Sequence, residues 1–212
     1  MESYDAESEQ KQERERQSII HQINPHFVFN TLATIRIITR VNSDLAYDMI
    51  YDFSKYLRAV IQSLTNPENI TFREEMDYVI SYTNLQRIRF GDNIGIHIDI
   101  RENDFLIPPM ALQPLLENAI IHGLKKGKLK GTVSIRSYQN TEEYIVQVED
   151  DGAGFDVKKY NRIPGNGSLK ESGLQRVSNR LEQMLGGTLE VNSIIGKGTV
   201  VTLHIPRFPE DK

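Results

Sequence analysis

Apolar positions near the start of the chain recur with the period of an α-helix. From Ser18 onward, one side of a helical wheel collects Ile19, Ile23, His26, Asn30, Ala33 and Ile37. After Ser43 a similar spacing of three and four returns in Leu45, Met49, Phe53, Tyr56, Val60 and Leu64. The two stretches predict a pair of helices joined by the short segment TRVNSD, which together form a helical hairpin.

A hairpin of two helices cannot bury both of its apolar faces by itself. We therefore expect two copies of the chain to pair as a homodimer, in which the hairpins form a four-helix bundle. Residues 1–17, which precede the hairpin, are almost entirely polar and charged. We expect them to form a helical lead-in or a disordered linker.

The pattern changes after Pro67. A capping box at Thr71–Glu74 predicts a helix that ends near Gly91, and the strict alternation from Ile94 to Ile100 predicts a half-buried strand. Further strands are expected at TVSIRSY, YIVQVED, TLEVNSI and TVVTLHI, and further helices at LQPLLENAII and GLQRVSNRLEQMLGG. One mixed sheet covered on one face by three helices would be a two-layer α/β sandwich.

These patterns predict the fold class α+β and three segments along the chain. The lead-in occupies residues 1–17, the dimeric helical hairpin residues 18–67, and the α/β sandwich residues 68–212.

Composition narrows the possible functions. The chain has 212 residues and a net charge of −4, which argues against binding nucleic acid. It has no cysteine, which excludes disulfides, thiolate metal sites and cysteine nucleophiles. No apolar run has membrane-spanning length, and the first residues lack the apolar core of a signal peptide. We expect a cytoplasmic chain, connected to a membrane only through a segment outside this sequence, as in the cytosolic portion of a membrane receptor.

The stretch INPHFVFNTL places Pro25 beside His26 within the first helical pattern. A proline in a helix interior costs about 3 kcal/mol, so it indicates either a turn that ends the helix or a kink that presents the histidine. Taken alone, His26 could be a core histidine in a kinked helix. If Pro25 kinks a continuous helix, we expect the bend just where His26 emerges.

Four motifs in the second half of the chain follow one another in order: LLENAIIHG, EDDGAGF, SGLQRVSNRL and GKGT. Each stands at the end of a predicted element. This succession resembles the nucleotide-binding domain of the GHKL ATPases (gyrase, Hsp90, histidine kinases and MutL), which has the Bergerat fold. Together with NPHFVFNTL upstream, it resembles the LytS/YehU type of sensor histidine kinase. Any single glycine motif would be weak evidence, whereas an ordered set is strong.

The resemblance implies that ATP and Mg²⁺ are the cofactors. Asp150 would accept a hydrogen bond from the adenine amino group, and Asn118 would bind Mg²⁺ through its side-chain oxygen. His122 would approach the phosphates, although it could equally cap the end of its helix. The other implied nucleotide-binding residues are Gly152, Gly154, Gly173, Leu174, Gly196, Gly198 and Thr199.

The resemblance also implies that His26 is the phosphoacceptor. Its imidazole would attack the γ-phosphate of ATP, and the phosphoryl group would then pass to an aspartate in the receiver domain of a response regulator. Asn30, one helical turn on, could hydrogen-bond the imidazole or form a polar layer that fixes the register of the bundle. Glu117 could polarise the attacking group or a water molecule.

The sequence departs from common histidine kinases at three positions. Phe27 stands where they carry an acidic residue, Pro114 where they carry an asparagine, and Glu171 where the second glycine box begins with glycine. Two alternatives stay open: a GHKL ATPase that drives a conformational clamp, in which Glu117 would activate the attacking water, and a non-catalytic dimeric pseudokinase scaffold, which Glu171 and Pro114 suggest.

Overall fold

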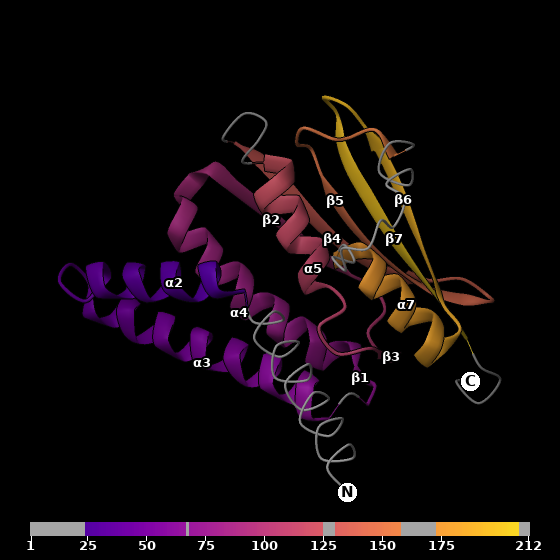
Figure 1. Cartoon of the computed structure of the whole chain (residues 1–212), viewed down its shortest axis with the longest axis horizontal. Helices are drawn as coiled ribbons and strands as arrows, with labels where there is room; N and C mark the ends of the chain where they lie inside the picture. Colours follow the sequence, from indigo (N-terminus) through magenta and orange to yellow (C-terminus); the bar gives the residue numbers. More distant parts are fainter. Residues whose placement is uncertain (1–23, 67, 125–129, 158–172, 208–212) are drawn as a thin grey trace, which may run out of the picture. The chain divides into compact units, whose positions relative to one another are not determined.

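The computed structural model describes residues 24–66, 68–124, 130–157 and 173–207, with the side chains of residues 122–124 outside this description. The chain divides after Asn66 into two compact units, each of which is described by itself (Figure 1). None of the described helices is both long and apolar enough to cross a membrane.

The first unit is a helical hairpin made of α2 (Pro25–Ile38) and α3 (Ser43–Thr65). An asparagine caps each helix: the side chain of Asn24 accepts from the backbone N–H of Phe27 at 3.2 Å, and Asn42 does the same for Leu45 at 3.0 Å. The seam between the helices is aromatic. The ring of Phe27 meets the ring of Tyr56 edge-on at 4.7 Å between centroids, and only 2% of Phe27 is exposed.

Pro25 begins α2 instead of bending it. Asn24 has an extended backbone (φ −68°, ψ 99°), and Pro25 occupies the first turn, where a missing N–H costs no helical hydrogen bond. The expectation of a proline inside a continuous helix is therefore wrong for the described residues. His21, whose carbonyl the kink would have displaced, lies outside them.

The buried face of α2 also differs from the one expected. The buried side chains are Phe27, Thr31 and Ile35, whereas His26 and Ala33 are exposed and Ile37 is 61% exposed. The stripe of side chains that begins with Phe27 faces α3. The stripe predicted from the sequence, which contains His26, Ala33 and Ile37, lies beside it on the exposed side of α2. On α3 the prediction is confirmed, because Met49, Phe53, Tyr56 and Val60 are all buried.

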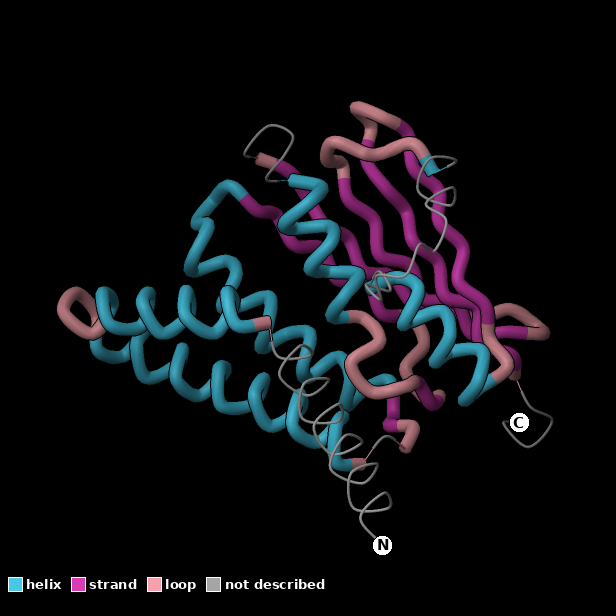
Figure 2. Tube along the Cα trace, viewed as in Figure 1, coloured by secondary structure: helices cyan, strands magenta, loops and turns pink. Residues whose placement is uncertain are grey.

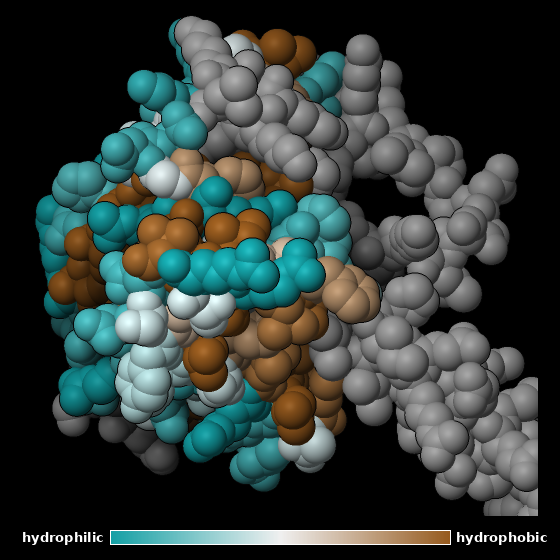
Figure 3. All heavy atoms as spheres, turned by 90° about the vertical axis from the view of Figure 1, so that its left-hand side faces the viewer, coloured by the Kyte–Doolittle hydropathy of each residue, from teal (hydrophilic) through white to brown (hydrophobic). Residues whose placement is uncertain are grey.

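The hairpin leaves large apolar side chains at its surface. They are Phe29, Leu32, Ile37 and Val41 on or just after α2, and Tyr47, Ile50, Tyr51 and Ile61 on α3. On the face of the molecule drawn in Figure 3, brown apolar side chains reach the surface between teal polar ones. Packing within a single copy therefore covers only part of the apolar surface of the hairpin.

The second unit contains a five-stranded mixed sheet with the strand order β2-β4-β5-β7-β6. The strands are β2 (Ile94–Ile100), β4 (Gly131–Gln139), β5 (Glu143–Asp150), β6 (Thr188–Ile194) and β7 (Gly198–Pro206). β2 runs parallel to β4, and every other pair is antiparallel. A small antiparallel pair joins β1 (Ile70–Thr71) to β3 (Leu106–Ile107). All five strands expected from the sequence are confirmed.

Helices cover one face of this sheet (Figure 2). They are α4 (Phe72–Phe90), followed by the short 3₁₀ turn η1 (Gly91–Asn93), then α5 (Gln113–Glu117), which continues as the π-helix η2 (Asn118–Leu124), and α7 (Gly173–Leu185). The capping box at Thr71 and Glu74 is present. The arrangement confirms the two-layer α/β sandwich.

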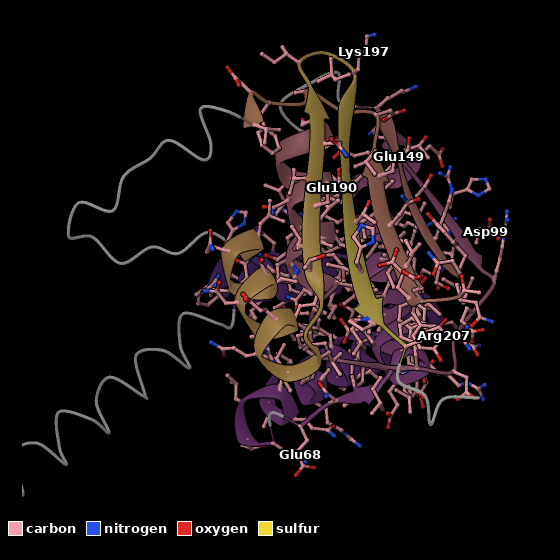
Figure 4. The ribbon with its side chains drawn as sticks, turned by 90° about the vertical axis from the view of Figure 1, so that its right-hand side faces the viewer. Glu68, Asp99, Glu149, Glu190, Lys197 and Arg207 are labelled. Carbon is pink, nitrogen blue, oxygen red and sulfur yellow. The ribbon has the colours of Figure 1, made fainter. Side chains whose placement is uncertain are left out.

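The two faces of the sheet differ in polarity. Val133, Ile135, Val146 and Leu203 point toward the helices and are completely buried. The open face carries charged side chains: Asp99, Glu149 and Glu190 lie over it in Figure 4, and Arg136 forms an ion pair with Glu149 at 3.0 Å. The core, and with it any buried site, therefore lies between the sheet and the helices.

Candidate functional site

A row of polar side chains crosses one end of the sheet on its buried face. Asp150, the last residue of β5, pairs with Thr199 of β7, which pairs with Ser193 of β6. The hydroxyl of Thr199 hydrogen-bonds the carboxylate of Asp150 and lies 3.0 Å from the hydroxyl of Ser193. The backbone N–H of Gly152 donates to the same carboxylate at 2.9 Å. The row is a connected hydrogen-bond network that fixes the orientation of Asp150.

Asp150 is buried, with only 6% of the residue exposed. Its burial, with a smaller contribution from neighbouring Asp151 and Glu149, raises its pKa from 3.8 to about 6, while the N–H of Gly152 and the hydroxyl of Thr199 oppose the shift. Asp150 is therefore mostly ionised at neutral pH and takes up a proton near pH 6. An ionised carboxylate accepts hydrogen bonds and donates none.

Two glycine motifs that are far apart in the sequence meet beside this row. Gly154 (φ +59°) follows β5, and Gly198 (φ +112°) begins β7. A Cβ on Gly154 would lie 2.7 Å from the carbonyl carbon of Ile194, and one on Gly198 would overlap the carbonyl oxygen of Asp150. The N–H of Gly196 also donates to the carbonyl of Ala153 at 2.7 Å. EDDGAGF and GKGT therefore form one structure in which backbone packs on backbone.

Asn118 stands at the junction between α5 and the π-helix and is half-buried. The π-helix packs against β4, β5 and β7. Single π-helical turns within α-helices are frequently found at functional sites. One residue earlier, Glu117 accepts a hydrogen bond from the side-chain amide of Gln113 at 2.9 Å. Asn118 therefore begins the helical turn that packs against the sheet that carries Asp150.

The start of α7 meets α5. A Cβ on Gly173 would lie 3.3 Å from the Cβ of Pro114, so glycine permits the close contact. Pro114 lies in the first turn of α5, a position that tolerates proline, which explains how it can stand where common kinases carry asparagine. Leu174 is buried, and its contact with a cofactor stays a prediction.

The single side-chain oxygen that Asn118 offers suits Mg²⁺ bound together with a nucleotide, and not a metal ion whose ligands all come from the protein. The described residues contain no group of three or more His, Cys, Asp or Glu side chains that could hold a metal ion. Mg²⁺ usually keeps several water molecules and is held by one or two protein oxygens together with substrate phosphates. The side chain of His122, and the whole of Glu171, lie outside the described residues.

His26 is the second residue of α2, in the first unit, and its side chain is exposed. The next residue, Phe27, points into the seam with α3, so an acidic residue at that position would be buried among aromatic rings. Asn30 lies one turn on, and its side-chain amide nitrogen is buried without a hydrogen-bond partner in the described part of the chain. Its role toward His26 stays a prediction.

Sequence reasoning missed Ser193. Its hydroxyl accepts from the N–H of Phe155 at 2.9 Å, and its one proton lies within reach of both the carbonyl of Gly198 at 3.1 Å and the hydroxyl of Thr199 at 3.0 Å, so it joins the loop after β5 to the turn before β7. The signal was available: in TLEVNSI the inward positions are Leu189, Val191 and Ser193, which places a serine on an otherwise apolar face.

Sequence models of two protein families match the chain. The family described as "Histidine kinase" matches residues 14–94, and the family described as "Histidine kinase-, DNA gyrase B-, and HSP90-like ATPase" matches residues 108–209. Between them they cover both units.

Curated relatives give the same result. The chain is 34% identical over 198 residues to the sensor histidine kinase YpdA of Escherichia coli and 30% identical over 200 residues to the sensor protein LytS of Staphylococcus saprophyticus. Each alignment covers 91% of this chain and 34% of the relative, so the chain spans about a third of their length. An uncharacterized protein of Bacillus subtilis, YwpD, is 32% identical over 186 residues, which cover 87% of this chain and 67% of YwpD.

Among solved structures, the catalytic domain of histidine kinase ThkA matches with a TM-score of 0.52 and 18% identity, covering 68% of this chain and 99% of that domain. At this identity the match supports the fold alone. With both family matches and these relatives, the chain belongs to the histidine kinase family and resembles its LytS-type sensor kinases.

Proposed function

We propose that this chain is the transmitter region of a two-component sensor kinase, which transfers the γ-phosphoryl group of ATP to His26 and then to an aspartate in the receiver domain of a response regulator. The observation that carries the proposal is the row of Asp150, Thr199 and Ser193 at one end of the sheet, next to the glycine turns around Gly154 and Gly198. The π-helix that begins at Asn118 packs against the same sheet. The same chain presents an exposed histidine on a separate helical unit.

Asp150 would select adenine. Its carboxylate is ionised at neutral pH and is oriented by Gly152 and Thr199, so it can accept a hydrogen bond from the amino group of adenine. Guanine carries a carbonyl oxygen at the corresponding position, which an ionised carboxylate repels. The network therefore supports ATP over GTP.

The triphosphate would lie between Asn118 and the start of α7. The side-chain oxygen of Asn118 would hold Mg²⁺, and the helix start at Gly173 would face the phosphates with its first N–H groups. Bound Mg²⁺ would supply charge neutralisation at the phosphate oxygens. The backbone around Gly152, Gly154, Gly196 and Gly198 would shape the rest of the pocket.

His26 would act as the nucleophile through a neutral imidazole nitrogen. A bond forms between that nitrogen and the γ-phosphorus, the bond from the γ-phosphorus to the bridging oxygen of ADP breaks, and the ring releases its other N–H proton to the solvent to which His26 is exposed. Asn30 would orient the imidazole or form a polar layer in the bundle. Glu117, held by Gln113, would polarise the attacking group.

The functional form would be a homodimer. The hairpin exposes apolar side chains on both helices, and a second copy would cover them in a four-helix bundle. We expect the chain to act in the cytoplasm, attached to a membrane only through a segment outside this sequence. With its net charge of −4, we expect no binding to nucleic acid.

Incubation with γ-labelled ATP and Mg²⁺ tests the proposal. We expect a label that is stable in alkali and lost in acid, present in the wild type and in the His97→Gln control, and absent in His26→Gln. His97 is a suitable control because it is an exposed histidine on β2. Release of phosphate without label would indicate an ATPase clamp, and neither signal would indicate a scaffold.

A further inference from the structure

Glu75 is a buried carboxylate that the proposed chemistry does not use. It lies on α4 and is only 1% exposed. Its two oxygens accept hydrogen bonds from a turn more than thirty residues away in sequence: the backbone N–H of Met110 donates at 2.8 Å and that of Leu112 at 2.9 Å. The N–H of Ala111, between them, also hydrogen-bonds the carboxylate. One side chain therefore holds three consecutive residues.

The turn that Glu75 holds leads directly into α5. Met110 has φ +58° and is the one non-glycine residue with a positive φ among those described. A residue other than glycine keeps a positive φ only when the surrounding structure imposes that conformation. Leu112 is the N-cap of α5, and its carbonyl accepts the helical hydrogen bond from Leu116 at 3.0 Å. The helix has no side-chain cap of its own, so Glu75 acts as a cap supplied by another helix.

A third helix is connected electrostatically. Arg180, on α7, lowers the pKa of Glu75, against the burial that raises it to about 7. Glu75 in turn supports the charged form of Arg180, whose own pKa is lowered by burial. Glu75 belongs to α4, accepts hydrogen bonds from the turn that leads into α5, and interacts with Arg180 of α7. The start of α7 also touches α5 at Pro114. The carboxylate therefore lies among the three helices that cover the sheet.

We propose that Glu75 is a positioning residue for the nucleotide site, because it fixes the start of the helix that ends at Asn118. A shift of α5 by one residue would rotate Asn118 by about 100° and move its side-chain oxygen away from the metal position. The inference rests on the proposed function in one respect, which is that Asn118 binds Mg²⁺ with the nucleotide. It extends that function to a residue on α4, outside the sequence motifs.

The test compares Glu75→Gln with Asp77→Asn in the full chain. Glutamine keeps the shape of Glu75 but replaces one acceptor oxygen with a donor, so one loop N–H loses its partner. Asp77 is an exposed carboxylate on the same helix and serves as the matched control. The dissociation constant of ATP is measured with Mg²⁺ and again with excess EDTA, and hydrogen exchange is measured at the amides of Met110 and Leu112.

For Glu75→Gln we expect the dissociation constant of Mg²⁺-ATP to rise about tenfold, the lower end of the range for losing a residue that supports a metal ligand. The constant in EDTA should change much less, and exchange at both amides should accelerate. Asp77→Asn should change none of these. If Glu75→Gln does not fold, Arg180→Gln tests the link from α7 and should weaken Mg²⁺-ATP binding selectively, though by less.

Two results would overturn the inference. Equal losses with Mg²⁺ and with EDTA would make Glu75 a general support of the fold. Unchanged Mg²⁺-ATP affinity in a variant whose loop amides exchange faster would show that the turn does not position Asn118. A wild-type chain that binds no ATP would instead refute the proposed function, and this inference with it.

Discussion

Replacing Gly198 with alanine should damage the second unit far more than replacing Gly196, two residues earlier in the same turn. Gly198 has φ +112°, and a Cβ there would overlap the carbonyl oxygen of Asp150 and lie 2.8 Å from its carbon. Gly196 has φ +78°, and a Cβ there would meet nothing within 4 Å. The pair therefore separates backbone strain alone from strain combined with a steric clash.

The magnitudes follow from these two costs. An unfavourable φ costs about 1–3 kcal/mol, and forcing extra atoms into a packed contact costs about 1–3 kcal/mol more. Gly198→Ala should therefore lower the free energy of unfolding by about 4 kcal/mol, and Gly196→Ala by about 1 kcal/mol. At about 2–4 °C per kcal/mol for a domain of this size, the melting temperature should fall by about 8–16 °C and 2–4 °C, respectively.

Thermal unfolding followed by circular dichroism or calorimetry measures both shifts. Because the clash moves the backbone of Asp150, Gly198→Ala should also weaken ATP binding at temperatures where the variant is still folded. Equal shifts in melting temperature for the two variants would refute the reasoning, since they would mean that the β5–β7 contact yields without cost.

Three further predictions concern the network and the hairpin. ATP affinity should fall as the pH drops through about 6, because Asp150 then takes up a proton and loses the negative charge that strengthens its hydrogen bond to adenine. Asp150→Asn should bind ATP about tenfold more weakly at pH 7.5 and show a flatter pH profile, and parallel profiles of the two proteins would contradict this assignment. Phe27→Ala should destabilise the hairpin by about 3–5 kcal/mol through loss of its packing against Tyr56, measured by chemical denaturation; a loss below about 1 kcal/mol would show that the seam is not packed as described. Asn24→Ala should cost about 1 kcal/mol in the same assay and Pro25→Ala less, whereas a gain of stability of about 3 kcal/mol in Pro25→Ala would place the proline in a helix interior.

The sheet could be predicted from the sequence because each strand carries its own alternation. The order of helices and strands and the capping box at Thr71 followed from local patterns in the same way. The face of α2 could not, because several apolar stripes fit a helical wheel and only the partner helix decides which one is buried. The position of Pro25 in the first turn of α2 could not be predicted from the apolar pattern either. It depends on Asn24, whose side chain caps the helix at that point.

The candidate site divides in a similar manner. The resemblance of ordered motifs pointed to Asp150 and to the glycines, and the structure brings the EDDGAGF and GKGT motifs together. Glu75 was missed because its partners at Met110 and Leu112 are distant in sequence. The sequence did contain a signal for Glu75, because this residue lies on the same apolar stripe of α4 as Phe72, Met76 and Val79. A carboxylate buried on such a stripe needs a hydrogen-bond partner.

The position of the phosphoryl group tests the central claim most directly. After incubation with ATP and Mg²⁺, the chain is digested at alkaline pH, where phosphohistidine survives, and the modified peptide is identified by mass spectrometry. We expect one phosphoryl group on the peptide that contains His26, formed more slowly in Asp150→Asn because that variant binds ATP more weakly. A phosphoryl group on another residue, or none in a chain that binds Mg²⁺-ATP, would contradict it.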